Sequence, residues 1–303
     1  MKDLTTLLAD VDDHVRVALD VPPAEIDRGD YLDVTQLPTE PRTWHKLSDT
    51  LAVLADMKNS TKLGKNKSTV ATASIYDAAT GGVVHVFSDF EADYIAVQGD
   101  GALALFWGSR RYERAVCAGI TIKTFSADSL VPRLEKKWPD IAMTGLKVGI
   151  GNSPLLVRRI GNPRWGAPEP VWAGHAVNYA AKAAQQASRH QMIVTAGVWN
   201  WISGNEYLTL PCPCLAPIPP IWMDATIFRL PEGDPDRSGK LLLREWCPVH
   251  GPGYCAAVLA GQSARPDAGG RARAPAILAR KRFERRWRRA VRPVPGAPPG
   301  PAE

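Results

Sequence analysis

The sequence predicts an α+β fold, in which a sheet with antiparallel strands is covered by helices. Apolar segments of strand length alternate along the chain with segments of helical composition. Two of the apolar segments, 93–108 and 145–161, contain internal Gly turns that are typical of β-hairpins. Because hairpin strands are antiparallel, this mixture favours an α+β sheet with helices on one face.

The first part of the chain is expected to be a helical lead-in of about 44 residues, ended by a Pro-rich break. Its apolar residues at helical spacing are Leu4, Leu7, Leu8 and Val11. The apolar run 51–55 then predicts a short buried strand that ends at Asp56. Residues 69–86 predict a helix interrupted at Gly81-Gly82.

The middle of the chain supplies the two expected hairpins. Residues 93–108 turn at Gly99-Asp100 and are followed by two segments, 110–126 and 128–138, that fit helices. Residues 145–161 predict a second strand pair that turns at Gly151-Asn152.

The remaining segments predict a helix, a strand with a helix, and a closing strand. The Ala-rich segment 176–188 favours a helix by propensity, and 191–202 fits one more strand and helix. The tract 210–221 is too Pro-rich for regular structure, and 222–230 resembles a closing strand. From about residue 256 the composition turns to Ala, Arg, Gly and Pro, and the Pro-rich end, 292–303, is expected to be disordered.

Composition limits the function classes. The chain has 303 residues, 45% of them hydrophobic, which allows a sizeable core. We expect a cytoplasmic protein, because no apolar run reaches bilayer length and the start lacks the pattern of a signal peptide. Five cysteines, an odd number, argue against a disulfide framework.

The positive charge is concentrated at the C-terminal end. Residues 265–303 hold ten Arg and one Lys against three acidic residues, a net charge of +8. The whole chain carries +6, so the rest carries −2 and offers no broad nucleic-acid surface. The basic segment 280–289 is compatible with nucleic-acid or membrane contact, but a solvated or disordered extension is favoured.

Two carboxylates and a polar loop form the first group of candidate site residues. Asp56 ends the strand 51–55, and Asp100 lies at the tip of the first hairpin. If this strand lies beside the hairpin, the two carboxylates reach one sheet edge and can hold two divalent cations that clamp a triphosphate. The polar residues that follow Asp56 suit phosphate binding; they are Met57, Lys58, Asn59, Ser60 and Thr61.

Asn178 and Lys182 form the second group, because residues four apart share one face of a helix. An amide and a cation there are suited to orient a ribose and to neutralise charge on a reacting phosphate.

The ordered set of these residues resembles the class III nucleotidyl cyclase homology domain, over roughly residues 45 to 230. The resemblance implies a ferredoxin-like α+β domain that works as a head-to-tail homodimer with two divalent cations, Mn²⁺ or Mg²⁺, in each active site. Asp56, Met57 and Asp100 take the metal position. Asn178 takes the ribose role and Lys182 the place of the family's Arg, both acting across the dimer.

The chain departs from the family pattern at three positions. Lys182 keeps the charge of the Arg but not its bidentate fork, and Arg189 or Lys62 is an alternative source of positive charge. The two purine-reading positions of the family fall on Ala96 and Val171. Neither side chain can hydrogen-bond, so the polar edge of a purine would stay unpaired.

Three features are similar to those of the Pycsar pyrimidine cyclases of bacterial antiphage defence. They are the short Asp-Met-x-x-Ser loop of residues 56–60, the missing purine readers and the motif Trp246-Cys247-Pro-x-His250-Gly. The resemblance favours conversion of UTP to cyclic UMP over conversion of CTP to cyclic CMP, with a separate effector protein that senses the product. An adenylate or guanylate cyclase and a catalytically silent nucleotide-binding module are the alternatives.

The resulting division of the chain has four parts. We expect a helical segment over 1–44, the cyclase domain over 45–232, an extension over 233–264 and a disordered tail over 265–303. The extension and the Pro-rich tract contain a candidate structural zinc site. Its members are Cys212, Cys214, Cys247, His250 and Cys255.

Overall fold

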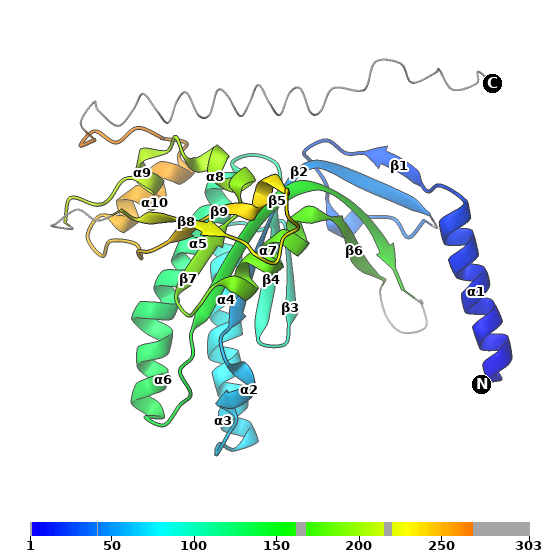
Figure 1. Cartoon of the computed structure of the whole chain (residues 1–303), viewed down its shortest axis with the longest axis horizontal. Coiled ribbons are helices and arrows are strands. Elements are labelled where there is room, and N and C mark those ends of the chain that lie inside the picture. Colours follow the sequence, from blue (N-terminus) through cyan, green and yellow to red (C-terminus); the bar gives the residue numbers. More distant parts are fainter. Residues whose placement is uncertain (1, 41, 162–167, 215–219, 269–303) are drawn as a thin grey trace.

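The computed structural model describes residues 2–40, 42–161, 168–214 and 220–268 (Figure 1). Its centre is a mixed sheet of nine strands in the order β3-β4-β2-β5-β7-β9-β8, with β1 paired to β2 and β6 paired to β5. The strands are β1 (Ala24–Asp27), β2 (Thr43–Met57), β3 (Tyr94–Gln98), β4 (Gly101–Phe106), β5 (Leu146–Ile160), β6 (Glu169–Gly174), β7 (Gln191–Val194), β8 (Trp222–Thr226) and β9 (Ser238–Leu242).

Two strands of 15 residues, β2 and β5, form the centre of this sheet. They pair antiparallel from His45↔Val157 to Met57↔Leu146, with one register shift between Leu47 and Thr50. The predicted strand 51–55 is therefore only the middle of β2. The second predicted hairpin is wrong, because 145–161 is one continuous strand and Gly151-Asn152 lies inside it.

The glycines of β5 serve close packing rather than a turn. A Cβ at Gly149 would lie 2.1 Å from the carbonyl oxygen of Ala180, and one at Gly151 would lie 2.8 Å from Cβ of Tyr179. Both contacts belong to helix α7 (His175–Gln186). Glycine within a strand thus marks the close approach of a helix backbone.

Helices cover both faces of the sheet, which corrects the expectation of helices on one face only. After the register shift, odd-numbered residues of β2 such as Leu51 and Val53 pack with helices α4 (Gly82–Asp89) and α5 (Arg111–Phe125) in the largest core. On the other face of the sheet, Ala52 of β2 and Leu103 of β4 belong to a second core with Ala176 and Ala180 of α7. Because strand side chains alternate between faces, β2 contributes to both cores.

The helices that cover the face with the largest core form two long, nearly continuous runs. The first consists of α3 (Thr69–Tyr76), a π-helical turn over Asp77–Gly81, and α4 (Gly82–Asp89). The expected interruption at Gly81-Gly82 is wrong, because the helical run continues through both glycines. The missing side chain of Gly82 instead makes room for the second run, since a Cβ there would lie 2.5 Å from the Phe125 ring. The second run is α5 (Arg111–Phe125), a π-helical turn over Ser126–Leu130, and α6 (Val131–Lys137).

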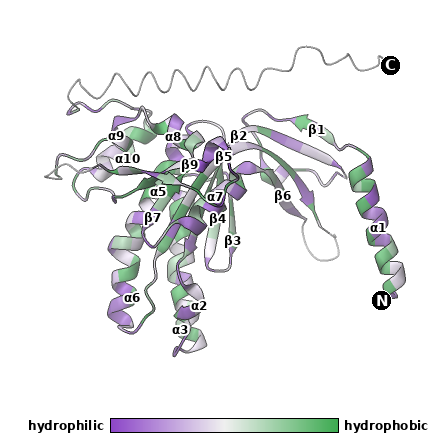
Figure 2. Cartoon of the chain, in the orientation of Figure 1, coloured by the Kyte–Doolittle hydropathy of each residue, from purple (hydrophilic) through white to green (hydrophobic). Residues whose placement is uncertain are grey.

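The N-terminal segment holds the predicted helix, α1 (Leu4–Asp20), followed by β1, a strand that the sequence did not predict. Figure 1 shows α1 projecting away from the sheet, and Figure 2 shows that it carries apolar and polar positions together. Its residues Leu4, Leu7, Leu8 and Val11 are all exposed, so they lie outside the cores of the described chain.

The C-terminal part is more ordered than its composition suggested. β9, which was not predicted, extends the sheet past residue 232, and helix α10 (Gly251–Leu259) packs on α5 and α9 (Glu206–Thr209). Arg265, the first residue of the expected disordered tail, is only 2% exposed. The basic segment 280–289 lies outside the described residues. In the described parts of the chain, no helix combines the length and the apolar character that crossing a membrane requires.

Candidate active site

Asp56 lies near the end of β2 with its carboxylate paired to a lysine. The register of the two central strands places it directly opposite Lys147 of β5, and Asp56 Oδ2 lies 2.6 Å from Lys147 Nζ. The Lys147 side chain is 14% exposed and that of Asp56 is 30% exposed. Both side chains project from the α7 side of the sheet, because Asp56 follows Ala52 and Leu54 at even spacing.

Asp100 lies beside Asp56 because the hairpin and β2 approach closely. β3 and β4 pair as predicted, from Tyr94↔Leu105 to Gln98↔Gly101, which leaves Gly99-Asp100 as a two-residue turn. A Cβ on Gly101 would lie 2.8 Å from the Ala55 carbonyl oxygen and 3.4 Å from Asp56 Oδ1. Glycine at this position therefore lets the turn that contains Asp100 lie against the end of β2.

Residues 57–61 form a fixed loop that leads into the short helix α2 (Ser60–Leu63). Met57 is buried and pairs with Leu146, and the Lys58 backbone N–H donates to the Gly145 carbonyl at 2.9 Å. Thr144 Oγ1 donates to the Lys58 carbonyl at 2.7 Å.

The turn of this loop depends on Asn59. Its backbone is left-handed, with φ of 59°, and its side-chain amide donates to the Met143 carbonyl at 2.8 Å. Asparagine tolerates this conformation better than most residues. Ser60 and Thr61 open α2, so their N–H groups have no carbonyl partner within that helix.

Asn178 and Lys182 lie on the outer side of α7. Ala176, Ala180 and Ala183 face the sheet and are buried, whereas Asn178 is exposed and Lys182 is half-buried. In the described part of the chain, no hydrogen bond or ion pair joins these two side chains to Asp56 or Asp100. In the described residues of one chain, the two groups therefore share no hydrogen bond or ion pair.

The two predicted base-reading positions are also far apart within one chain. Ala96 of β3 is half-buried, pairs with Leu103 and lies on the face that carries Asp56. Val171 of β6 is 41% exposed and pairs with Arg158, near the opposite end of β5 from Lys147. A single chain thus does not bring Ala96 and Val171 into one pocket.

Two curated relatives cover most of the chain. The uridylate cyclase of Micromonospora echinofusca is 60% identical over 265 residues, which are 88% of this chain and 87% of that protein. The uridylate cyclase of Propioniciclava tarda is 43% identical over 267 residues, 86% of each chain. The chain belongs to the uridylate cyclase family. It is therefore a nucleotidyl cyclase, although no protein-family model matches it.

The fold agrees with this assignment. A class III adenylyl cyclase-like ATP-binding protein from Pseudomonas aeruginosa aligns with 95% of this chain and 53% of its own length. The TM-score is 0.53 and the identity is 14%, so this likeness concerns the fold alone. The prediction of an α+β class III cyclase fold is confirmed.

Lys147 is the residue of this uridylate cyclase family member that sequence reasoning missed. A lysine in the segment GLKVGIG gives no signal by itself. Lys147 pairs with Asp56 only if 145–161 is one continuous strand beside β2. The turn that we expected at Gly151-Asn152 is incompatible with such a strand, so the sequence did not predict this pairing.

A hydrogen-bonded group fixes the start of β5 beside Lys147. The Leu146 N–H donates to Ser126 Oγ at 2.7 Å, and Ser126 Oγ lies 3.0 Å from Nδ1 of His190. Burial, followed by the positive charges of Arg189 and Lys123, lowers the pKa of His190. In the neutral imidazole, Nδ1 can accept a hydrogen bond from the Ser126 hydroxyl, so this form supports the strand end.

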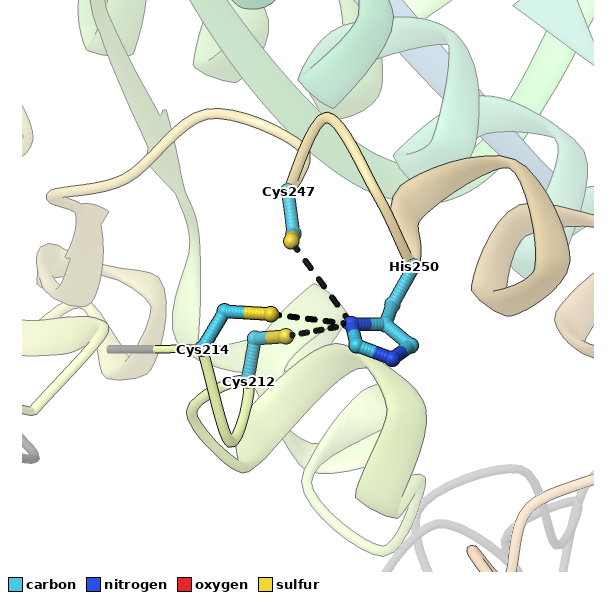
Figure 3. Close-up of side chains that lie close together, drawn as sticks. All are labelled: Cys212, Cys214, Cys247 and His250. Atoms are coloured by element: carbon cyan, nitrogen blue, oxygen red, sulfur yellow. Dashed lines mark hydrogen bonds between the residues drawn. The ribbon is translucent and has the colours of Figure 1, made fainter. Parts of the chain in front are cut away.

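Four of the five predicted zinc ligands come together. Cys212, Cys214, Cys247 and His250 place one ligand atom each within 4.8 Å of the others (Figure 3). Cys255 does not belong to this group. Its thiol hydrogen-bonds to the fully buried Cys117 of α5, and α10 turns it toward the main core.

Proposed function

We propose that the chain is a metal-dependent uridylate cyclase that converts UTP to 3′,5′-cyclic UMP and pyrophosphate. The observation that carries this proposal is the pair of carboxylates, Asp56 and Asp100, brought to one end of the sheet in a chain 60% identical to a uridylate cyclase. The alternative products follow in the order cyclic CMP, then cyclic AMP or cyclic GMP.

The donor set at this sheet end suits a hard divalent cation. Asp56 and Asp100 offer carboxylate oxygens, and the backbone of Met57 adds a carbonyl oxygen nearby, which are ligand types that Mg²⁺ and Mn²⁺ accept. Bound cations neutralise phosphate charge and lower the pKa of an attacking hydroxyl. When no cation is bound, the Lys147 ammonium group neutralises the Asp56 carboxylate. When nucleotide binds, the same ammonium group is positioned to pair with triphosphate oxygens.

The proposed reaction is an intramolecular displacement at phosphorus. The ribose 3′-oxygen forms a bond to the α-phosphorus, the bond from that phosphorus to the pyrophosphate oxygen breaks, and the hydroxyl proton passes to solvent. The backbone N–H groups of Ser60 and Thr61, which have no carbonyl partner within α2, bind the phosphates. Catalysis is then alignment together with charge neutralisation.

Asn178 and Lys182 act from a second copy of the chain in this proposal. Both side chains lie on the outer side of α7, where Asn178 is exposed and Lys182 is half-buried. A head-to-tail homodimer places this surface over the Asp56 end of the partner. Asn178 then orients the ribose, and Lys182 neutralises the phosphate in the transition state.

Uracil is favoured because Ala96, on the face that carries Asp56, has no hydrogen-bonding side chain. A purine edge next to it would be desolvated without a partner. Production of a cyclic pyrimidine nucleotide for an antiphage effector follows from the resemblance alone and stays a prediction.

A four-nucleotide assay tests the proposal. The purified chain is incubated with ATP, GTP, CTP or UTP and Mn²⁺, and products are identified by mass spectrometry. We expect cyclic UMP from UTP, absent from the Asp56→Ala, Asp100→Ala double variant. Cyclic CMP alone would keep the chemistry and change the base. A lack of any cyclic product from a folded dimer would favour a silent nucleotide-binding module.

A further inference from the structure

The Cys/His group lies in two segments that are distant in sequence. Cys212 and Cys214 follow helix α9, and Cys247 and His250 precede helix α10. Figure 3 shows the three sulfur atoms and Nδ1 of His250 directed toward one central point. None of the four residues touches Asp56 or Asp100 within the described ranges, so the group is separate from the active site.

The distances match a tetrahedral metal site. Nδ1 of His250 lies 3.2 Å from the Cys212 sulfur, 3.3 Å from that of Cys214 and 3.9 Å from that of Cys247. Zinc bonds of about 2.3 Å to sulfur and about 2.0–2.1 Å to nitrogen separate tetrahedral S and N ligands by about 3.6 Å. Three sulfurs with one imidazole nitrogen are a standard closed set for structural zinc.

The surroundings hold these ligands in place. The His250 ring stacks on Tyr254 at 5.8 Å between centroids, and the Tyr254 hydroxyl contacts the Cys212 sulfur at 4.0 Å. Arg265 lies over the Tyr254 ring at 4.6 Å and pairs with Asp267 at 2.6 Å. Such outer contacts fix ligand orientation in metal sites.

We propose that Cys212, Cys214, Cys247 and His250 bind one structural zinc ion. The ion ties the segment after α9 to the start of α10, where the Gly251 N–H already donates to the Cys247 carbonyl at 2.7 Å. All four positions are occupied by protein, which leaves no open position for substrate. The ion stabilises the packing of α10 on the domain, because the four ligands come together only in the folded chain and the binding free energy therefore adds to folding.

The metal content of the full chain, purified without a histidine tag, tests this proposal. We expect about one zinc per chain by mass spectrometry of the elements after dialysis. X-ray absorption should show three sulfur neighbours at about 2.3 Å and one nitrogen at about 2.0–2.1 Å. A zinc content below about a tenth per chain, or a shell of oxygen only, would overturn the proposal, given the tight binding of such sites.

Matched variants separate this site from other metal sites. Cys247→Ala should lose the zinc, whereas Cys255→Ala, in the following helix α10, should keep it. His250→Cys should retain the metal and His250→Ala should release it. The Asp56→Ala, Asp100→Ala double variant should keep its zinc, which distinguishes the site from the active centre. Equal zinc in every variant would contradict the assignment. If a variant does not fold, the X-ray absorption spectrum of the unmodified chain still tests which atoms bind the zinc.

Discussion

Lys147 Nζ lies 2.6 Å from Asp56 Oδ2, at directly paired positions of β5 and β2. The ammonium group therefore occupies the position from which it competes with a cation for the same carboxylate. This relationship connects the register of the two central strands to the charge state of the proposed metal site.

Lys147→Gln should tighten Mn²⁺ binding in the absence of nucleotide and lower turnover of UTP. A partly exposed ion pair is worth up to about 1 kcal/mol, so we expect about a two- to fivefold gain in Mn²⁺ affinity. Electron paramagnetic resonance of free Mn²⁺ measures this affinity, and Lys147→Arg is the charge-preserving control. Unchanged Mn²⁺ binding in Lys147→Gln would mean that the ion pair does not control the site.

Mixing two inactive variants should restore activity if Asn178 acts across the dimer. Under this proposal, Asp56→Ala and Asn178→Ala should each inactivate every site of their own homodimer. In a mixed dimer, one of the two sites combines an intact Asp56 with an intact Asn178. Random mixing in a two-fold dimer predicts about a quarter of the normal activity. Activity that stays at the level of the separate variants would place both residues in one chain's site.

Gly149→Ala should destabilise the fold by about 2–3 kcal/mol, because the new methyl group overpacks the contact between β5 and α7. Its Cβ would meet the backbone of Ala180 at 2.1 Å and that of Ala184 at 2.3 Å. Urea unfolding measures the change. Gly253→Ala is the control, because no atom lies within 4 Å of a Cβ at that position. Equal stabilities of the two variants would show that α7 can move away without cost.

Acidification should destabilise the chain through His190. Burial and the nearby Arg189 and Lys123 lower its pKa below 6.5, so the unfolded chain binds the proton more readily than the folded one. Its contribution is present above pH 6.5 and is lost as the pH falls below that value. The difference in unfolding free energy between the wild type and His190→Gln should therefore shrink from pH 7.5 to pH 5.5. His45, whose pKa is also lowered by burial, is present in both proteins and cancels from this difference. Parallel curves would exclude the effect.

Local turn chemistry predicted the hairpin that carries Asp100, because Gly-Asp between two apolar runs has few other interpretations. The same reasoning was wrong at Gly151, since a glycine can serve a turn or a close helix contact. Only the position of α7 distinguishes these cases. Gly82 shows the same ambiguity, because its lack of a side chain accommodates the Phe125 ring.

The sequence predicted which residues belong to the candidate sites, but it did not predict which of them lie next to one another in the fold. Asp56 and Asp100 were found because each ends or joins apolar runs, whereas Lys147 required the strand register. Five Cys and His residues had suitable spacing for zinc, but the direction of α10 excludes Cys255 and leaves four. Long-range packing decided both cases, and the sequence carries no local signal for it.

The outward position of Asn178 on α7 has a consequence for how the enzyme is controlled. If each complete site needs two chains, specific activity depends on the dissociation constant of the dimer as well as on substrate supply. Dilution then silences the protein without any inhibitor, and activity rises with the square of chain concentration while monomers predominate. The abundance of the chain would itself act as a threshold.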